Sequence, residues 1–196
     1  PDPYGAPGDD RHTPGGTVYP ACTEQVRSVV RIARRYGVAL WPYGRGRNLG
    51  FGGAAPLLRG SLRMDLRRMN RILHIDEELA YAVVEPGVRW SDLYEEVRRL
   101  GYRLTTPTPD LGWGSIIGNT MDAGITYQRY GADHLLATGM AVVLPAGDLL
   151  RTGMGAMTDN PAWHLYGRGW GPDLAGLFAQ SNYGIVTRMG IRLQRR

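Results

Sequence analysis

The chain has 196 residues and a net charge of +5, with 43% hydrophobic and 21% charged residues. These proportions exclude a disordered or fibrous chain and predict a globular protein with a sizeable core, as one large domain or two smaller lobes. No apolar run approaches the roughly 20 residues of a membrane helix, and no signal-peptide pattern follows the initial proline, so we expect no membrane partner.

The basic residues are all arginine, and they are spread along the chain. Since no arginine-rich block alternates with aromatic residues, we expect no nucleic-acid partner, and a small phosphate-bearing ligand explains part of the charge. Cys22 is the only cysteine and cannot form an intrachain disulfide. No oxidising compartment is implied, and we expect a cytoplasmic rather than a periplasmic protein.

The first periodic segment follows a lead-in over residues 1–22. The pattern predicts a helix over 24–36, with Thr23 as its N-cap, an apolar stripe at Val26, Val29, Val30 and Ala33, and Gly37 as its end. A strand over 38–41 follows, so this part reads as an αβ unit.

The glycine-rich stretch 41–53 comes directly after that strand, and the chain is organised around it. Five glycines fall within ten residues, interleaved with Arg45 and Arg47. Glycine allows positive φ, and successive backbone N–H groups in such a turn converge on an anion, for which guanidinium groups add charge. The stretch predicts a cradle for the diphosphate of a dinucleotide; a flexible surface turn remains the alternative. Its spacing matches neither the Rossmann fingerprint nor a P-loop.

The later segments predict mainly strands. These are 60–66, 71–76, 81–84, 184–193 and a hairpin of 136–144 with 149–153, while Ser91 is expected to cap a helix over 92–100. We predict an α+β chain of two lobes joined near residue 75. Residues 1–75 form a small, partly parallel lobe, and residues 76–196 form a larger, mostly antiparallel sheet with helices on one face.

A second glycine-rich stretch spans 107–120. Ser115 is expected to cap a short helix whose N-terminus adds a further anion site, and Asn119 could both donate and accept at the edge of a heterocycle. Two such loops from two lobes would face one cleft and suit a long ligand such as a dinucleotide.

Many ordered motifs together resemble the FAD-binding domain, of the PCMH type, in the vanillyl-alcohol oxidase and p-cresol methylhydroxylase (4-cresol dehydrogenase) family. The motifs lie at 40–42, 46–48, 52–56, 84–88, 109–112, 118–120, 130–134, 151–155 and 180–187. The motifs at 151–155 and 127–134 point to the phenol-oxidising branch.

The resemblance implies FAD and no metal. It implies cofactor contacts at Pro42, Gly44, Arg45, Gly46, Arg47, Asn48, Leu49, Gly50, Pro109, Asp110, Leu111, Gly114, Ser115, Gly118, Asn119, Asp122, Gly124, Tyr127, Gly184, Ile185 and Val186. It further implies oxidation of a para-substituted phenol or benzylic alcohol by hydride transfer to flavin N5, with oxygen or an electron-transfer protein as acceptor and a homo-oligomeric state. Asp110 matches the family carboxylate near flavin N5 and is the catalytic candidate; a turn-forming aspartate is the alternative.

The chain departs from the family pattern at several places. Phe51, in the expected substrate pocket, stands where phenol-oxidising members have a tyrosine that hydrogen-bonds the phenolate, and losing such a bond costs about 1.5–3 kcal/mol. Trp113 replaces a residue that is commonly glycine in the family, which predicts a tighter flavin-side pocket or a stacking face. Tyr43-Gly44-Arg45 replaces a less charged stretch of the family, which is expected to strengthen diphosphate binding. Two alternatives therefore stay open: the same fold acting on a non-phenolic alcohol or hydroxy acid, and a flavin-binding module without catalysis. The family's substrate, or cap, domain has no counterpart in these residues, so we expect the chain alone to bind FAD weakly and to turn over little.

Overall fold

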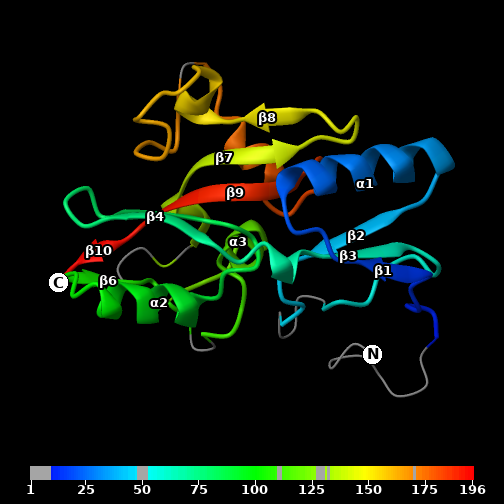
Figure 1. The fold of residues 1–196 in the computed structure, drawn as a ribbon, viewed down its shortest axis with the longest axis horizontal. Coiled ribbons are helices and arrows are strands. Elements are labelled where there is room, and N and C mark those ends of the chain that lie inside the picture. Colours follow the sequence, from blue (N-terminus) through cyan, green and yellow to red (C-terminus); the bar gives the residue numbers. More distant parts are fainter. Residues whose placement is uncertain (1–9, 48–52, 110–111, 127–130, 132, 170) are drawn as a thin grey trace.

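The computed structural model describes residues 10–47, 53–109, 112–126, 131, 133–169 and 171–196. Two sheets of different character lie side by side in it, a small parallel sheet and a larger antiparallel one (Figure 1). Along the described chain, no helix is both long enough and apolar enough to cross a membrane.

The small sheet is built from the first elements of the chain. Strand β1 (Gly16–Val18) leads into helix α1 (Thr23–Tyr36), which crosses over to β2 (Leu40–Tyr43). Strand β3 (Leu62–Asp65) lies between β1 and β2 and runs parallel to both. A short 3₁₀ turn, η1 (Leu66–Arg68), follows it. This is the expected αβ unit, although β2 begins and ends two residues later than the strand predicted over 38–41.

Helix α1 shows why the local sequence is helical. Gly37 ends it in the left-handed region at φ 65° and donates its N–H back to the last turn, as a glycine can at low cost. The residues of its buried face are Val26, Val30 and Ala33. The N-cap position is Cys22, so the prediction that Thr23 caps the helix is wrong: Thr23 already has helical geometry and is the first residue of the helix.

The large sheet has the strand order β4-β5-β9-β7-β8, and every neighbouring pair is antiparallel. Its strands are β4 (Ile72–Asp76), β5 (Tyr81–Val84), β9 (Ile185–Arg192), β7 (Ala137–Val143) and β8 (Leu149–Arg151). The hairpin and the strands expected at 71–76, 81–84 and 184–193 are confirmed. The strand at 72–76 already pairs in this second sheet, so the change of sheet comes just before it.

Helices α2 (Trp90–Arg99) and α3 (Ile116–Met121) share the main core with the inward residues of this sheet. Trp90 and Leu93 of α2 are fully buried there. Strands β6 (Leu104–Thr105) and β10 (Gln194–Arg195) pair with each other as a separate, antiparallel two-stranded sheet. Three 3₁₀ turns complete the chain: η2 (Asp133–Leu136), η3 (Gly153–Ala156) and η4 (Ala175–Phe178).

The start of α2 differs from the prediction. The helix begins at Trp90 with Arg89 as N-cap, and Asp92 accepts the backbone N–H of Arg89 at 2.8 Å. Ser91 lies inside the first turn, and its N–H donates to the carbonyl of Gly112. The expected Ser91 cap is therefore wrong, because the carboxylate of Asp92 takes the capping role from the third helical position.

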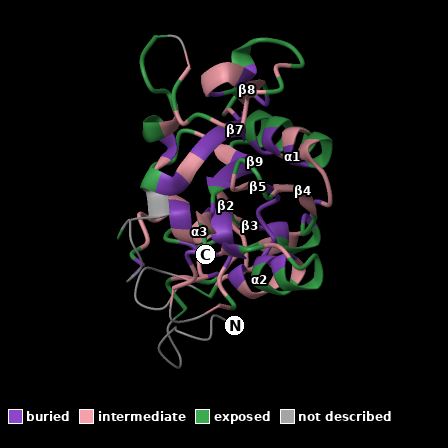
Figure 2. Ribbon diagram, turned by 90° about the vertical axis from the view of Figure 1, so that its left-hand side faces the viewer, coloured by how far each residue is buried: buried purple, intermediate pink, exposed green. Residues whose placement is uncertain are grey.

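Helix α1 also packs against the large sheet, at the end of β7. Val26 and Val30 share a second core cluster with Met64 of β3 and Val143 of β7. Arg27 Nε donates to the carbonyl of Gly147, in the turn of the β7–β8 hairpin, at 2.9 Å. Figure 2 shows this continuity, with buried residues running from the sheets to the helices.

Candidate functional site

A cleft of about 1850 Å³ is lined by residues of both sheets. Its walls come from the end of α1, β2 and the loop after it, the start of α3, the β7–β8 turn and the segment 176–186 that leads into β9. Clefts for drug-sized ligands are typically about 300–1,000 Å³, so this one suits a longer molecule.

The described part of the glycine-rich loop, 44–47, follows the end of β2, and all four of its residues line the cleft. Gly46 adopts φ 59°, the left-handed conformation that turns successive N–H groups to one side. The indole N–H of Trp41 donates to the carbonyl of Gly53 at 3.1 Å and thereby holds the two ends of the loop together. A turn with this left-handed glycine is suited to holding an anion with its backbone N–H groups.

The end of β2 is anchored by a buried polar pair. The Tyr43 hydroxyl donates to Asp65 at 3.0 Å, and Asp65, only 1% exposed, is also paired with Arg67 at 2.7 Å. Burial and the neighbouring Asp65 carboxylate raise the pKa of Tyr43 to about 12. Tyr43 therefore stays protonated and acts as a hydrogen-bond donor that fixes the strand end.

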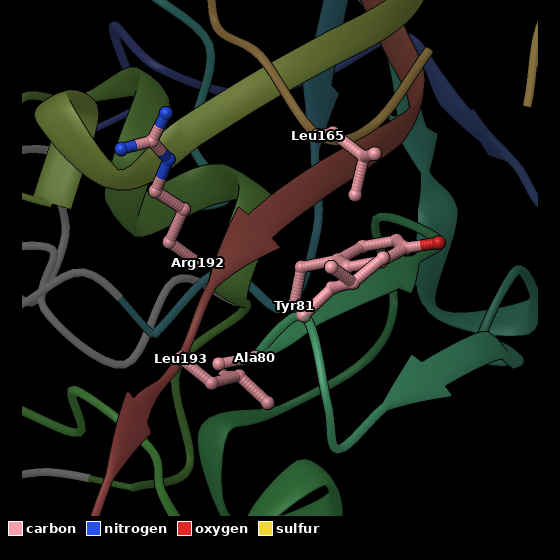
Figure 3. Close-up of a pocket in the computed structure, with 6 residues that line it drawn as sticks. Ala80, Tyr81, Leu165, Arg192 and Leu193 are labelled. Carbon is pink, nitrogen blue, oxygen red and sulfur yellow. The ribbon is translucent and has the colours of Figure 1, made fainter. Parts of the chain in front are cut away.

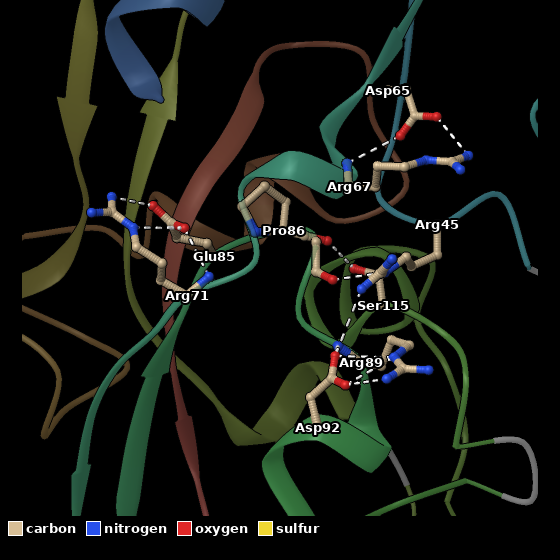
Figure 4. Close-up of polar contacts among 10 residues, drawn as sticks. Arg45, Asp65, Arg67, Arg71, Glu85, Pro86, Arg89, Asp92 and Ser115 are labelled. Atoms are coloured by element: carbon tan, nitrogen blue, oxygen red, sulfur yellow. Dashed lines mark hydrogen bonds and ion pairs between the residues drawn. The ribbon is translucent and has the colours of Figure 1, made fainter. Parts of the chain in front are cut away.

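The loop touches the second lobe at Gly44. A side chain there would lie 2.5 Å from the Ser115 hydroxyl and 2.6 Å from the carbonyl of Pro86, so only glycine fits. Ser115 Oγ donates to that carbonyl at 2.6 Å and accepts the N–H of Gly118 at 3.0 Å, as Figure 4 shows in part. The prediction that Ser115 caps a short helix is confirmed. The same hydroxyl also links the start of α3 to the turn at Pro86.

The two arginines of the loop differ. Arg47 is exposed and lines the cleft. Arg45 also lines it, but its guanidinium Nε donates to the carbonyl of Gly87 at 2.7 Å, and a terminal nitrogen lies 3.7 Å from Asp92 of α2 (Figure 4). Burial is the main reason that the pKa of Arg45 is lowered. In this structure Arg45 is engaged with the second lobe.

The far wall is formed by the segment before β9. Gln180 adopts φ 48°, unusual for a residue with a side chain, and its N–H donates to the carbonyl of Met121 at 2.7 Å. Its side-chain amide donates to the carbonyl of Asp122 at 3.3 Å. Gln180 thus satisfies carbonyls at the C-terminal end of α3 and holds this segment against that helix.

Most of the predicted cofactor residues that the structure describes meet at the cleft. These are Pro42, Gly44, Arg45, Gly46, Arg47, Gly114, Ser115, Gly118, Asn119, Asp122, Gly184, Ile185 and Val186. Pro109 and Gly124 are described but do not line it; a side chain at Gly124 would meet the Asn119 amide at 2.3 Å, so this glycine makes room for Asn119. Trp113 is 53% exposed and lies outside the lining.

The remaining predictions fall on residues that the structure does not describe. They are Asn48, Leu49, Gly50, Phe51, Asp110, Leu111 and Tyr127. Their roles stay predictions.

Several lining residues were not among the predicted cofactor residues. They are Pro145 in the turn of the predicted hairpin, Tyr183 in the motif at 180–187, and the exposed Leu57, Leu58 and Leu177. The three leucines are marked in the sequence only by apolar character in loop segments, which is visible as a surface feature only once the fold is known.

A second hollow, of about 190 Å³, is lined by Tyr81 and Leu165, whose side chains lie near each other, and by Arg192, whose guanidinium points away from them (Figure 3). It is too small for a dinucleotide and is separate from the large cleft.

The walls of the large cleft match the chemistry of a flavin dinucleotide. The backbone of 44–47 and Arg47 offer donors for a diphosphate, and the apolar Ile117, Phe178 and Val186 offer surface for rings. Donors between apolar walls are the expected surroundings for a diphosphate that joins two ring systems.

Comparison with known proteins gives consistent results. A family described as an FAD binding domain matches residues 14–153. The flavoprotein subunit of 4-cresol dehydrogenase [hydroxylating] from Pseudomonas putida is 42% identical over 184 residues, and 1'-carboxy-chondrochloren decarboxylase from Chondromyces crocatus is 41% identical over 184 residues. These matches cover 93% and 90% of this chain but 35% and 33% of the relatives.

Solved structures agree. The 4-ethylphenol oxidase from Gulosibacter chungangensis superposes with a TM-score of 0.94 at 47% identity, over 99% of this chain and 37% of that one. A substrate-bound p-cresol methylhydroxylase gives 0.93 at 39%, over 95% and 36%. The chain spans about a third of the length of the relatives it matches. With most of its length matched by that family and the same two-lobed fold in these structures, the chain belongs to the FAD-binding domain family, and its cofactor is FAD.

Proposed function

We propose that this chain is the FAD-binding part of an oxidoreductase that oxidises para-substituted phenols or benzylic alcohols. The observation that carries the proposal is the cleft, where thirteen of the predicted cofactor residues, those named above, come together from both lobes. The support for the substrate class comes from the names of similar proteins, which act on 4-cresol and 4-ethylphenol.

The residues of the chain then have distinct tasks. Bound FAD supplies the hydride acceptor for the benzylic carbon of the substrate. The N–H groups of 44–47 and the charge of Arg47 bind the diphosphate, and Asn119 orients a ring edge from the start of α3. Ile117, Phe178 and Val186 exclude water from the ring-bearing parts of the cleft. We assign Asp110 the role of a base toward an incoming nucleophile, on the strength of its sequence motif alone.

A second candidate function follows from the decarboxylase relative. It matches this chain almost as well as the 4-cresol dehydrogenase does, at 41% against 42% identity over the same length. Similar FAD-binding parts thus occur in one relative named as a dehydrogenase and in another named as a decarboxylase. Together with Phe51, which has no hydroxyl for a phenolate, this supports a different substrate on the same fold.

The test is an absorption spectrum of the purified full-length protein, repeated on the supernatant after acid precipitation. It is followed by anaerobic mixing with 4-cresol and 4-hydroxybenzyl alcohol and, separately, with aliphatic alcohols and hydroxy acids. We expect a flavin spectrum that bleaches with the two phenolic substrates. A flavin spectrum that bleaches only with aliphatic alcohols or hydroxy acids would favour the second candidate. A protein that takes up no flavin, even after incubation with FAD, would contradict both.

The partners are part of the proposal. The relative from Pseudomonas putida is named as a flavoprotein subunit, which supports an electron-transfer protein as acceptor here; oxygen is the other acceptor that we consider. Reoxidation of the bleached flavin by air within seconds would indicate that oxygen is the acceptor. Reoxidation only by an added electron-transfer protein would indicate that such a protein is the acceptor. We propose a homo-oligomer, which light scattering of the purified protein would test.

A further inference from the structure

The cradle loop is tied to the second lobe through the side chain of Arg45. Its Nε–H donates to the carbonyl of Gly87 at 2.7 Å, and a terminal nitrogen lies 3.7 Å from Asp92. Only 24% of the Arg45 side chain is exposed. A guanidinium held in this way joins the end of β2 to the turn before α2 and to the first turn of that helix (Figure 4).

Both partners of Arg45, the carbonyl of Gly87 and the carboxylate of Asp92, are fixed by their own surroundings. The N–H of Gly87 donates to the carbonyl of Met69 at 2.7 Å, and a side chain at Gly87 would lie within 2.8 Å of three backbone carbonyl oxygens. Asp92 accepts the backbone N–H of Arg89 and the Nε–H of its side chain, at 2.8 and 2.9 Å. Arg45 therefore binds to rigid groups, so its own position and that of the loop are set.

The charges agree with this geometry. Burial alone would raise the pKa of Asp92, but the hydrogen bonds from Arg89 and the charges of Arg89 and Arg45 hold it below its usual value. Asp92 is thus a carboxylate at neutral pH, and it faces the guanidinium of Arg45 from the first turn of α2 (Figure 4).

We propose that Arg45 is a positioning residue, which holds the cradle 44–47 against the second lobe and so sets where its N–H groups meet the diphosphate of FAD. The proposal rests on the proposed FAD site. It differs from the sequence-based expectation, in which the Arg45 guanidinium contacts the phosphates itself. The two roles predict different thermal midpoints for the apoprotein of an Arg45 variant. They also predict opposite changes in FAD affinity when the Asp92 carboxylate is removed.

The experiment compares wild type, Arg45→Gln, Asp92→Asn and the double variant, each as full-length apoprotein. FAD affinity is measured by flavin fluorescence titration, and the thermal midpoint of the apoprotein is measured without FAD. Arg99→Gln is the control, because it removes an arginine from the exposed face of α2, where Arg99 pairs with Glu96.

A positioning role predicts that Arg45→Gln weakens FAD binding by about tenfold and lowers the apoprotein midpoint by about 3 °C or more. Asp92→Asn should weaken FAD binding in the same direction by a smaller factor, and the double variant should bind about as weakly as Arg45→Gln alone. Arg99→Gln should match the wild type.

Each of the following results would overturn the proposal. Weaker FAD binding with an unchanged apoprotein midpoint, or tighter FAD binding by Asp92→Asn, would make Arg45 a direct phosphate ligand. A lower midpoint with unchanged FAD affinity would make its role purely structural. If the wild type bound no FAD, the proposed function would fail as well, whereas wild-type binding with an unaffected Arg45→Gln variant would reject this inference alone.

Discussion

At the scale of single residues, Gly44 decides how closely the two lobes approach. Its Cα lies where any added carbon would meet the Ser115 hydroxyl at 2.5 Å and the Pro86 carbonyl at 2.6 Å. The carbonyl belongs to a buried turn and cannot move away easily. The loop was recognisable from sequence as glycine-rich, but the reason for this particular glycine is a contact with residues 42 and 71 positions later in the chain.

Gly44→Ala is expected to lower the free energy of unfolding of the apoprotein by about 1–3 kcal/mol, because the methyl group must displace Pro86 or Ser115. Urea unfolding measures this. Gly176→Ala is the matched control for stability: an added carbon there meets nothing within 4 Å, so we expect a change of about 0.5 kcal/mol or less. Equal effects of the two substitutions would contradict the close approach seen at Gly44.

His164 is a second residue whose environment has a measurable consequence. It stacks on Trp163 with ring centroids 4.4 Å apart, and its Nδ1 lies 3.0 Å from the carbonyl of Gly139. Burial, opposed by the bond to Gly139 and helped by the charge of Arg188, lowers the pKa of His164 to about 4. The imidazole is therefore neutral in the folded protein well below the pH at which it gains a proton in the unfolded chain.

This shift predicts a loss of stability in mild acid. Below the unfolded pKa of 6.5 the unfolded chain binds a proton that the folded protein does not, so stability falls as the pH drops from about 6.5 to about 4 and changes no further below that. Allowing for partial exposure of the ring, the loss is on the order of 2 kcal/mol. Urea unfolding at pH 7.5 and 5 should show the fall in wild type and in His12→Gln, and a smaller fall in His164→Gln. A fall of equal size in His164→Gln would show that other groups cause it.

At the scale of elements, helices α2 and α3 begin with different capping chemistry. Helix α3 is capped by Ser115, as its sequence predicts, whereas α2 is capped through Asp92 although Ser91 is the better cap by residue type. Serine caps are recognisable from sequence only when the helix boundary is known. Helix α2 begins two residues before its predicted start, at Trp90, which is fully buried.

The pair of serines offers a direct comparison. Ser115→Ala removes the acceptor for the Gly118 N–H and the donor to the Pro86 carbonyl, and it should cost about 1–3 kcal/mol of unfolding free energy. Ser91→Ala removes a hydroxyl that has no capping role and should cost about 0.5 kcal/mol or less. Chemical unfolding of both variants decides the matter, and a larger loss for Ser91→Ala would reject the observed cap assignment.

The same scale shows how far the sequence predicts this fold. Alternating apolar residues located β4, β5, β7 and β9 within one or two residues, because each strand has one face in the core. Pairing order was not predictable, since β9 lies between β5 and β7 through contacts made more than 40 residues apart. The same holds for the cleft. Its glycine-rich loops were predicted from the sequence, whereas the position of Gln180 in its wall depends on how segments distant in the chain meet.

For the whole molecule, the position of the cleft couples the two lobes to one ligand. Residues 44–47 belong to the lobe of the parallel sheet, and Asn119, Phe178 and Ile185 belong to the lobe of the antiparallel sheet. Helix α1 already packs against both sheets, and Arg31 donates to the Gly147 carbonyl at 3.2 Å. A ligand that spans the cleft adds contacts to both lobes at once, so FAD is expected to stabilise them together.

Saturation with FAD at 100 times its Kd should therefore raise the free energy of unfolding by about 2.7 kcal/mol, and the gain should be seen in both lobes. Hydrogen exchange of the apoprotein and the FAD complex measures this, with β2 reporting on one lobe and β9 on the other. Riboflavin, which lacks the diphosphate, is the matched ligand: it should protect the amides of 44–47 less than FAD does, because these N–H groups have no phosphate to bind. Protection by FAD confined to β9 would place the dinucleotide outside the cradle, and equal protection of 44–47 by riboflavin would show that the loop closes without a diphosphate.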